Sequence, residues 1–599
     1  MLTIFSRIQE VASAAVQEHY GVSVDPSSLS IQETRKDFEG DFTLVTFPLT
    51  KHKLGAPQQI GETLGNLLQE RMEEIVAFNV VKGFLNLSLS QQFWLNFLSE
   101  AHKDDAYLKN EIGAGKKVVV EYCSPNTNKP LHLGHLRNIS LGYSLTQILE
   151  ANGYEVHPTI LFNDRGTNIS KSMVSWQLAG KGDTPESAGK KGDKFVGDYY
   201  VAFGNKLAVE AQPFMEQGMS KRDAEKQTAV MQKVNEMTIA WEAEDPEIRQ
   251  LWEQMNGYVY GAVNETFKRL GVHFESTYYE SKVYKRGKET VAEGLDKGIF
   301  YEKEDGAIEA DLTEDGLDKK LMLRSNGTSL YITQDLAVAE DKYKEFGMDK
   351  SIYVVGNEQD YHFKVLFTVL KKLGVPYSEG LFHLSYGMVE LLGGGKMKTR
   401  EGTTVEADDL MDEMIQKARE ESQKNPDKTL GMSEEELEKL YNVLGIGALK
   451  YYLIKVDPKK RMIFDPKESI DLKGNTGPFI QYSYTRTQAV LRKAQTDFLD
   501  FSANNQPEEA LLDSERSLMK LMLKFPEILK EAGESYNPSL IGNYVYDVAK
   551  EYNRFYHEAP ILKENQLKTS QFRLALSSFA GKILKECMRL IGVGMPDRM

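Results

Sequence analysis

An apolar segment runs directly into a polar loop in Lys117-Val-Val-Val-Glu-Tyr-Cys-Ser-Pro-Asn-Thr-Asn-Lys-Pro-Leu-His-Leu-Gly-His135. The continuous apolar run at its start is typical of a strand that is covered on both faces of a parallel sheet. A helical pattern follows over about 132–151, with Gly153 at the position of a C-terminal cap. A second strand is predicted over Val156–Phe162. Strand, helix and strand in this order form the first unit of a parallel α/β sheet.

The sequence around this unit predicts an N-terminal domain and a larger α/β domain. Residues 1–112 mix short helical and strand patterns, which favours a small α+β domain, and 80–89 alternates like one half-buried strand. Residues 113–470 are expected to form a Rossmann-like α/β domain. Its parallel sheet is predicted to continue at Ser351–Val355 and Leu381–Val389.

Two further segments are predicted to be helical. A polar stretch at about 185–300 is interpreted as a helical insertion carried by the α/β domain. Residues 471–599 are predicted to form an all-α bundle, because apolar residues such as Tyr544, Val548 and Tyr552 recur every four positions along one helix face.

The composition is that of a globular protein of several domains. With 599 residues the chain is too long for a single core, and its 41% hydrophobic and 27% charged residues are ordinary. No apolar run approaches the roughly 20 residues of a membrane-spanning helix, and the N-terminus lacks a secretory pattern. Because Cys123 and Cys587 are the only cysteines, a disulfide framework and a structural four-cysteine zinc site are excluded. A cytoplasmic location without membrane attachment is expected.

The charge is unevenly distributed along the chain. The net charge of −15 argues, by itself, against a nucleic-acid partner. Residues 471–599, however, carry 17 Lys and Arg against 16 Asp and Glu, which leaves −16 for the rest. A near-neutral C-terminal domain is able to present a basic face, although ordinary surface variation explains the same numbers.

The loop that ends at His135 has the features of a nucleotide site. It follows a strand at the carboxyl edge of a parallel sheet, where loop amides and a helix N-terminus attract phosphate. Gly134 allows a flat base or ribose to approach the backbone, and His132 and His135 are placed to donate hydrogen bonds to phosphate oxygens. A metal pair, or two histidines satisfied locally, are the alternatives; no cysteine or carboxylate cluster lies nearby in sequence to complete a metal site.

The histidine motif resembles the His-x-Gly-His signature of class I aminoacyl-tRNA synthetases and related nucleotidylyltransferases. A second signature of those synthetases is matched by Gly393-Gly-Gly-Lys-Met-Lys-Thr-Arg-Glu-Gly-Thr-Thr-Val405, which resembles their Lys-Met-Ser-Lys-Ser loop. Lys396 and Met397 match, whereas Thr399 stands where the second lysine is usual.

This departure resembles the arginyl-tRNA synthetases, in which that lysine is often missing and a lysine before the histidine motif is thought to replace its charge. Lys129 occupies that place. The resemblance spans essentially the full chain and implies that catalysis rests on His132, His135, Lys129 and Lys396. It implies ATP contacts from Gly134, His132, His135, Lys396, Met397, Lys398 and Thr399.

An arginine pocket requires carboxylates, because a buried guanidinium without acceptors is costly. Candidate residues follow the predicted strands or lie one helical turn apart. They match the arginyl pattern Glu-x-x-Ser-Pro-Asn, Tyr-x-x-x-Asp and Gln-Asp-x-His. The residues expected to bind arginine are Glu121, Asn126, Glu280, Tyr331, Asp335 and Gln359.

By the same resemblance, Asp335 pairs with the guanidinium and Tyr331 packs on the aliphatic stem, while Asn126 and Gln359 hold the α-carboxylate and α-amino groups. A pocket of this polarity needs no hydrolytic editing site, so the insertion is not assigned to editing.

The resemblance also implies the reaction and the partners. The carboxylate of L-arginine would attack the α-phosphate of ATP, and a ribose hydroxyl at the 3′ end of tRNA(Arg) would then take the arginine from the adenylate. Mg²⁺ is expected with ATP, and a protein nucleophile is not. The first step is expected to depend on tRNA. The oligomeric state stays open, with a monomer as the working expectation.

The N-terminal domain resembles the family's additional domain for the tRNA elbow, and the C-terminal bundle resembles its anticodon domain. The expected tRNA contacts are Tyr482, Arg486, Asn553, Tyr556 and Met599. As aromatic residues at helical spacing, most of them are better explained as core than as contacts.

Three alternatives remain at this point. Another class I synthetase is disfavoured by the absent zinc-ligand cysteines and by the Tyr-x-x-x-Asp pattern. A small nucleotidylyltransferase would not need the C-terminal bundle. A catalytically inactive RNA-binding relative is disfavoured by the two intact signatures.

Overall fold

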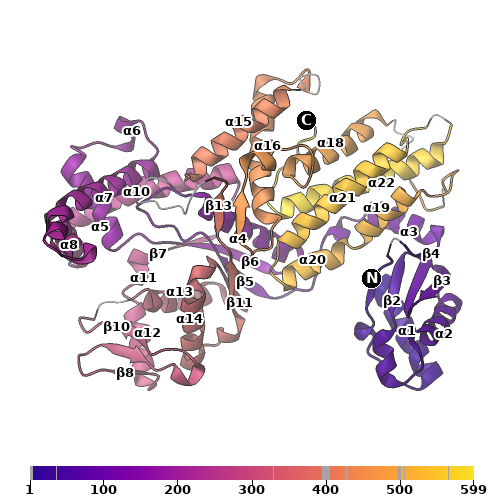
Figure 1. Cartoon of the computed structure of the whole chain (residues 1–599), viewed down its shortest axis with the longest axis horizontal. Coiled ribbons are helices and arrows are strands. Elements are labelled where there is room, and N and C mark those ends of the chain that lie inside the picture. The colour runs from indigo at the N-terminus through magenta and orange to yellow at the C-terminus, as the bar shows by residue number, and fades with distance from the viewer. Residues whose placement is uncertain are drawn as a thin grey trace. The chain divides into compact units, whose positions relative to one another are not determined.

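A computed structural model describes most of the chain, and its internal contacts separate it into two compact units (Figure 1). The described residues are 4–35, 37–327, 330–393, 405–424, 429–494, 501–504, 506–563 and 565–599. Unit 1 comprises Met1–Tyr107, Arg486–Phe525 and Lys550–Ile583, and unit 2 comprises Leu108–Thr485, Pro526–Ala549 and Leu584–Met599.

A five-stranded parallel sheet organises unit 2, as the sequence predicts. Its order is β12-β11-β5-β6-β7. The strands are β5 (Lys117–Glu121), β6 (Glu155–Phe162), β7 (Ser276–Tyr279), β11 (Lys350–Gly356) and β12 (Leu381–Tyr386). The chain runs outward from β5 in one direction to β7 and in the other to β12. The point of reversal beside β5 opens a crevice at the carboxyl edge, where ligands bind in sheets of this kind.

Helices cover both faces of this sheet. Val119 of β5 belongs to the core beneath α13 (Tyr331–Phe346) and α14 (Asp360–Leu373). Since side chains alternate along a strand, Val118 and Val120 point to the other face, which carries α4 (Leu133–Ala151). All three valines are fully buried, which explains the uninterrupted apolar run.

The helical insertion is shorter than predicted. After α5 (Thr167–Ala179) it contains α6 (Pro185–Ala188), α7 (Gly192–Glu216), α8 (Lys221–Gln227), α9 (Ala229–Glu242) and α10 (Pro246–Leu270). The range of about 185–300 is therefore wrong at its end, because β7 at 276–279 is a strand of the central sheet. Its four residues are too few to show a strand pattern in the sequence.

Short elements follow β7. They are α11 (Glu280–Val283), α12 (Gly287–Asp296) and an antiparallel sheet of β8 (Phe300–Glu302), β9 (Ile308–Ala310) and β10 (Lys320–Leu323). The single strand predicted over 381–389 is two: β12 ends at Tyr386, and β13 (Val389–Leu391) pairs in parallel with β14 (Met462–Phe464). Gly387 lies between the two strands and packs closely on the backbone of Lys460. A Cβ at this position would lie 2.6 Å from that backbone.

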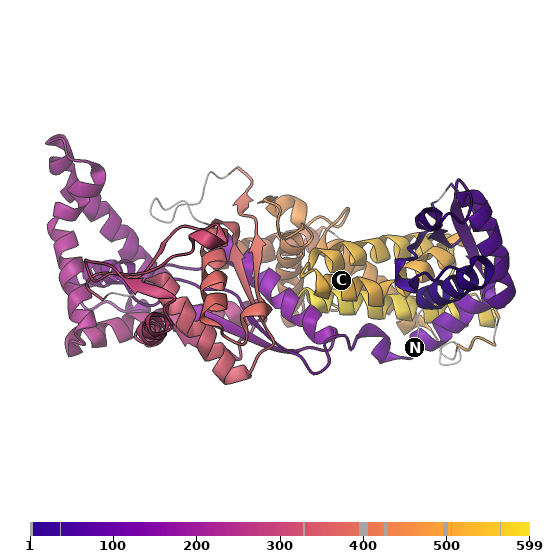
Figure 2. The same ribbon diagram turned by 90° about the horizontal axis from the view of Figure 1, so that it is seen from below.

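Three helices of unit 2 follow: α15 (Ala407–Gln423), α16 (Glu434–Ile454) and α17 (Pro466–Ser469). The chain beyond 471 is helical, as predicted. It contains α18 (Gly477–Lys493), α19 (Asp513–Leu523), α20 (Phe525–Glu534), α21 (Ser539–Glu558) and α22 (Leu567–Leu590). Figure 2 shows α21 and α22 as long neighbouring helices near the end of the colour scale.

The N-terminal part of unit 1 is an α+β domain. Its antiparallel sheet has the order β1-β2-β4-β3, with β1 (Ile31–Glu33), β2 (Phe42–Val45), β3 (Ile75–Val81) and β4 (Phe84–Leu89). Its helices are α1 (Ile4–Tyr20), α2 (Pro57–Arg71) and α3 (Gln91–Ala101). The single strand predicted over 80–89 is wrong, because a tight turn at Lys82 (φ 51°) and Gly83 (φ 80°) makes this segment part of a hairpin.

Within unit 1 the N-terminal domain packs on C-terminal helices. Phe97 of α3 lies 6.0 Å from Phe579 between ring centroids, and Lys520 forms a 2.6 Å ion pair with Asp41. Arg573 and Glu515 form a fully buried ion pair of 2.6 Å between α22 and α19. Among the helices that the structure describes, none is long and apolar enough to cross a lipid bilayer.

We expect Gly142→Ala to destabilise the protein. A Cβ at this position of α4 would lie 2.2 Å from the ring of Tyr122, which follows β5. Overpacking of this kind costs about 1–3 kcal/mol, more than the roughly 1 kcal/mol that alanine gains over glycine in a helix. Gly257→Ala in α10, which meets open space, is the matched control. Denaturant unfolding measures both; equal stability of the two variants would contradict the tight packing of α4.

Candidate functional site

The loop after β5 is held by one buried amide. Asn138 of α4 accepts a hydrogen bond from the backbone N–H of Cys123 at 2.6 Å. Its Nδ2 donates to the carbonyl of Val354 at 2.7 Å and to the hydroxyl of Tyr386 at 3.2 Å. Cys123 has φ of 59°, a conformation that non-glycine residues rarely adopt. Asn138 thus joins the carboxyl ends of β5, β11 and β12 at the switch point of the sheet.

The two histidines of the motif form a compact pair at the start of α4. His132 is the N-cap, and its Nδ1 accepts a hydrogen bond from the N–H of Gly134 at 3.1 Å. The N–H of His132 donates to Nδ1 of His135 at 3.1 Å, and the ring centroids are 4.0 Å apart. Because both Nδ1 atoms accept, each proton of the neutral rings is on Nε2. The capping geometry therefore leaves an Nε2–H donor on each ring.

Both rings are neutral at physiological pH. Burial lowers the pKa of His132 to about 4, and the positive charge of Lys129 lowers it further. Burial, His132 and Lys129 lower the pKa of His135 well below its usual range. The pair supplies hydrogen-bond donors without formal charge, so the charge next to them comes from half-buried Lys129.

A backbone ladder joins this motif to the segment before α15. The N–H of Ala407 donates to the carbonyl of Leu131 at 2.8 Å, and the N–H of Leu133 donates to the carbonyl of Val405 at 3.3 Å. Lys396, Met397, Lys398 and Thr399 of the second signature lie outside the described residues. Their predicted roles stay predictions.

Acidic side chains gather beyond the carboxyl ends of β6 and β7. Glu280 begins α11 and is 5% exposed, and it accepts a hydrogen bond from Gln334. Burial raises its pKa to about 7, and the charges of Asp164 and Asp335 also raise it, whereas Arg165 and Gln334 lower it. A cation that binds next to such a carboxyl group stabilises its ionised form.

Tyr331 and Asp335 lie on the same side of the first turns of α13, as their spacing predicts. The Oδ2 of Asp335 is 2.6 Å from Nε2 of His362, and its side chain is 27% exposed, so it is accessible without pointing into bulk water. Tyr331 is 69% exposed, and burial raises the pKa of its hydroxyl, as does the negative charge of Glu280. Glu280 and Asp335, the candidate partners of the guanidinium, and Tyr331, predicted to pack on the aliphatic stem, thus share one electrostatic neighbourhood.

The other three predicted arginine residues lie at the same edge but differ in their partners. Glu121 ends β5 with its Oε2 2.5 Å from Nζ of the fully buried Lys342. Asn126 is exposed and pairs through its backbone with Asn163 after β6. Gln359 is exposed at the N-terminus of α14, after β11. The Glu121 carboxylate has an internal cation, so its role toward arginine stays a prediction.

Several residues of the site escaped the sequence analysis. Asn138 and Lys342 lie inside ordinary helical patterns, and the signal for Lys342 is its position seven residues after Asp335, on the same helix face. Arg165 follows β6 directly; it forms a 2.5 Å ion pair with Glu242 and lies 4.0 Å above the ring of Tyr284. Its position after a strand was a usable signal.

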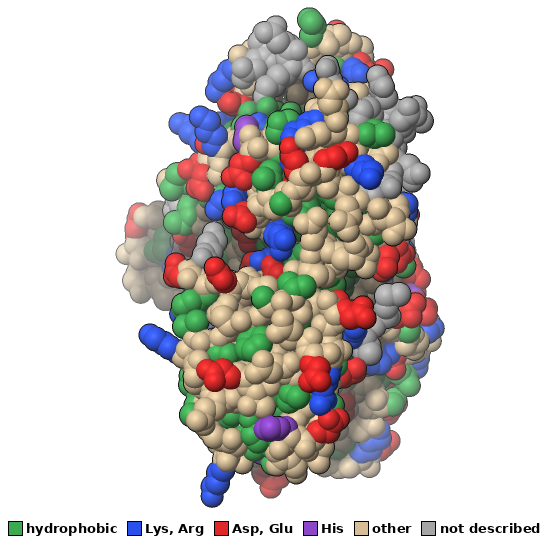
Figure 3. All heavy atoms as spheres, turned by 90° about the vertical axis from the view of Figure 1, so that its right-hand side faces the viewer, with side chains coloured by type: hydrophobic (Ala, Val, Ile, Leu, Met, Phe, Trp, Pro, Cys, Tyr) green, Lys and Arg blue, Asp and Glu red, His purple; other side chains and the backbone are tan. Residues whose placement is uncertain are grey.

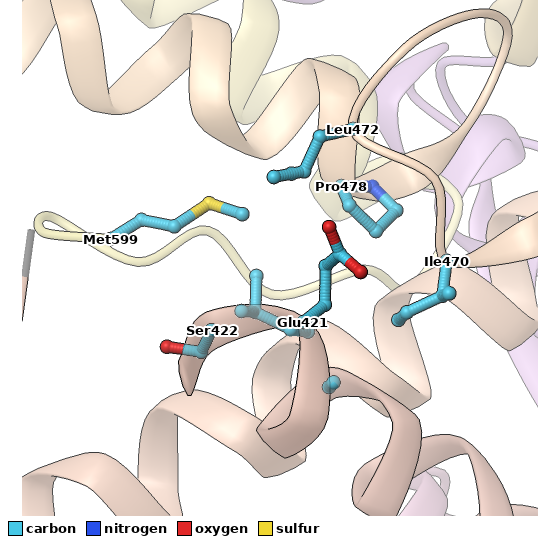
Figure 4. A pocket seen from close by; sticks show the side chains of 8 residues that line it. Glu421, Ser422, Ile470, Leu472, Pro478 and Met599 are labelled. Carbon is cyan, nitrogen blue, oxygen red and sulfur yellow. The ribbon is translucent and has the colours of Figure 1, made fainter. Parts of the chain in front are cut away.

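The predicted tRNA contacts fall into two groups. In unit 1, Arg486 donates a hydrogen bond to Asn553 and lies 5.3 Å from the ring centre of Tyr556, which is 36% exposed. In unit 2, Tyr482 is half-buried and Met599 lines a pocket. Figure 4 shows this pocket, whose labelled lining residues are Glu421, Ser422, Ile470, Leu472, Pro478 and Met599.

Surface charge on the face drawn in Figure 3 is mixed. Lysine and arginine side chains are interspersed with aspartate and glutamate there. A single basic patch does not mark this face. Among the described residues, no group of three or more His, Cys, Asp or Glu side chains is arranged to hold a metal ion.

The chain matches two protein-family models. Residues 98–465 match the catalytic domain of class I tRNA synthetases of the arginine (R) type, and residues 480–599 match the DALR anticodon-binding domain. The first match covers more than half of the chain, so the chain has the catalytic domain of a class I aminoacyl-tRNA synthetase.

Full-length relatives are more specific. The chain is 48% identical over 599 residues to an arginine–tRNA ligase of Parabacteroides distasonis, covering 100% of both chains. It is 49% identical over 581 residues to an arginine–tRNA ligase of Bacteroides thetaiotaomicron, covering 97% of each. The arginyl-tRNA synthetase structure of Thermus thermophilus has the same fold, with a TM-score of 0.79, 24% identity and 100% coverage of both chains. The chain belongs to the arginyl-tRNA synthetase family.

We expect Asn138→Leu to impair catalysis more than stability. The substitution keeps the branched shape but leaves the buried N–H of Cys123 without its acceptor, which costs about 1–3 kcal/mol. The strained conformation of Cys123 should then relax and displace the loop that carries the histidines. Adenylate formation and thermal unfolding measure the two effects. Asn152→Leu, which removes a buried asparagine at the other end of α4, is the control; an equal loss of activity in both variants would contradict the local role.

Proposed function

We propose that the edge of the central sheet binds ATP and arginine side by side and that the neutral histidine pair stabilises the reacting phosphate. As a member of its family, the chain is an arginine–tRNA ligase that forms arginyl-adenylate and pyrophosphate and then charges tRNA(Arg). The observation that carries the assignment of the arginine site is the shared electrostatic neighbourhood of Glu280, Asp335 and Tyr331.

Arginine recognition follows from the acceptors in this neighbourhood. The guanidinium presents five donors and one positive charge, which match the ionised carboxylates of Glu280 and Asp335. Tyr331 packs on the aliphatic stem, and Asn126 and Gln359 hold the α-carboxylate and α-amino group. Glu121, with Lys342 at 2.5 Å, contributes its remaining oxygen to the α-amino end.

Phosphate chemistry falls to the loop before α4. His132 and His135 donate from Nε2 to the α-phosphate, while Lys129 and Lys396 supply positive charge. The arginine carboxylate attacks in line and pyrophosphate leaves, so a protein nucleophile is not needed. Gly134, Met397, Lys398 and Thr399 complete the ATP site.

Magnesium is proposed to enter as a complex with ATP. Mg²⁺ in nucleotide sites keeps several waters and is bound by phosphate oxygens with one or two carboxylates, so phosphate oxygens and water would be its main ligands.

The C-terminal helices are proposed to read the anticodon through Tyr482, Arg486, Asn553, Tyr556 and Met599. Unpaired bases stack on aromatic rings and arginine planes, which suits the exposed edge of the pair formed by Arg486 and Tyr556. We also propose domains over 1–112, 113–470 and 471–599, a cytoplasmic location and a monomer.

The decisive experiment is ATP–pyrophosphate exchange with each of the twenty amino acids, with and without tRNA(Arg). We expect exchange with arginine alone. Asp335→Asn removes a charge-assisted bond of about 1.5–3 kcal/mol, so KM for arginine should rise about ten- to hundred-fold. His135→Ala should instead lower kcat and leave KM for arginine nearly constant.

Glu379→Gln, which changes an exposed residue paired with Lys371, is the matched control for the loss of a carboxylate. Exchange that depends on another amino acid, or an Asp335→Asn variant with unchanged KM, would overturn the pocket assignment.

We expect KM for arginine to fall as pH rises from 6 to 8. In the empty pocket the pKa of Glu280 is about 7, so below that pH the guanidinium has to displace a proton. The ionised fraction rises about tenfold between pH 6 and pH 8, and KM should fall by about the same factor. The histidine pair titrates below this range and does not contribute. Glu280→Gln should give a higher KM with a flat profile; a flat profile in the unaltered protein would contradict the role of Glu280.

A further inference from the structure

The insertion touches the nucleotide loop directly through α7. At Gly197 a Cβ would lie 2.7 Å from Cδ of Pro130 and 3.7 Å from Cα of Lys129. The proline ring is rigid, so any group added at Gly197 pushes the backbone of the loop rather than a flexible side chain. Because Gly197 has no side chain, α7 packs closely against Lys129 and Pro130, which precede the two histidines.

The same helix holds the start of α15 through one carboxylate. Nζ of Lys191, the N-cap residue of α7, is 2.6 Å from Oδ2 of Asp408 and 2.5 Å from Oγ1 of Thr266. Thr266 donates to the same Asp408 oxygen at 2.9 Å, and Arg269 of α10 donates to Oδ1 at 2.7 Å. Asp408 thus accepts three hydrogen bonds from two insertion helices.

These bonds differ from ordinary surface ion pairs. Exposed pairs contribute little because solvent screens them and both side chains are mobile. The side chains of Lys191 and Asp408 are only 23% and 22% exposed, and Thr266 between them is fully buried. Burial and shared partners give this cluster a defined geometry, which is the property that positioning requires.

The segment that α7 holds is the one that pairs with the histidine motif. Nζ of Lys194, one turn into α7, is 3.0 Å from Oε2 of Glu406. Residues 405–407 form the backbone ladder with 131–133, in which His132 lies opposite Glu406. The insertion helix therefore contacts both strands of this ladder, one through Gly197 and the other through its lysines.

We propose that α7 is a positioning element of the ATP site, with Gly197, Lys191 and Asp408 as positioning residues that fix the histidine motif against residues 405–407. This inference rests on the proposed role of His132, His135 and Lys129 in binding ATP. It gives the insertion a part in adenylate formation that is distinct from amino-acid selection, since the arginine residues lie on other elements.

Two glycines of α7 provide the sharpest test. Gly197→Ala adds a methyl group against Pro130, whereas Gly204→Ala, seven residues along the same helix, adds it in open space. Both changes improve helix propensity, so neither should lower the melting temperature through the helix itself. Misplacement by about 1 Å at a catalytic site can cost on the order of a hundredfold in rate. We expect Gly197→Ala to lower kcat/KM for ATP at least about tenfold while KM for arginine stays within about twofold.

A second pair of variants tests the cluster around Asp408. Lys191→Met removes the central cation, and Lys190→Met removes a neighbouring lysine whose ion pair with Asp198 is exposed. We expect only Lys191→Met to reduce kcat/KM for ATP, and Asp408→Asn to reproduce its effect. This pair decides the question if Gly197→Ala does not fold.

The measurements are ATP–pyrophosphate exchange with tRNA present, at varied ATP and at varied arginine, and thermal unfolding. Equal kinetics of Gly197→Ala and Gly204→Ala, together with unchanged kinetics of Lys191→Met, would overturn the proposal. A parallel rise of KM for both substrates with a lower melting temperature would overturn it too, because it indicates general damage. His135→Ala separates the two levels: if exchange survives that change, the proposed ATP site fails, and if it is lost while Gly197→Ala and Lys191→Met are both silent, only the inference about α7 fails.

Discussion

The amide of Asn138 joins the end of β5 to the ends of β11 and β12, which lie more than 200 residues further along the chain. Its bonds to Cys123, Val354 and Tyr386 tie these strand ends together and hold the conformation of Cys123. The histidine loop begins at Cys123, so its geometry depends on this one side chain. Because the amide is buried and each of its groups is bonded, any displacement of the strands leaves a polar group unpaired. The histidine loop is therefore held in place by the strands of the sheet.

Two sites of opposite electrostatic character lie at the same edge of the sheet. In the histidine loop, burial and Lys129 keep the rings neutral, so their Nε2–H groups are the uncharged donors proposed for a phosphate. Around Glu280, burial and neighbouring carboxylates hold the pKa at about 7 although Arg165 lowers it, so this carboxyl group is partly protonated at neutral pH. Lys342 forms an ion pair with Glu121 at 2.5 Å, which leaves Glu280 and Asp335 as the proposed acceptors for the guanidinium. In this proposal arginine binds at the acidic site and ATP at the histidine loop.

Local sequence patterns predicted the strands and helices that are long or strongly periodic, among them β5, α4 and the C-terminal helices. They failed where the secondary structure depends on tertiary contacts. β7 has four residues and belongs to the sheet only through its pairing with β6, and the hairpin at Lys82 and Gly83 was hidden because alternation continues across the turn. The motif residues were found because a family resemblance names them. Asn138, Lys342 and Gly197 were not, since a buried amide, a buried lysine and a close glycine contact depend on partners far away in the chain.

The insertion is better explained as a support for the proposed ATP site than as a means of selecting the amino acid. Charged acceptors reject an amino acid that lacks the guanidinium, because the site's carboxylates would then stay buried without partners, so discrimination requires no second hydrolytic site. The insertion helices instead place their lysines, Thr266 and Arg269 on Asp408 and Glu406. These contacts lie beside the histidine ladder, whereas Glu280 and Asp335 belong to α11 and α13. In the proposed assignment, amino-acid selection and support of the ATP site are therefore carried by different elements.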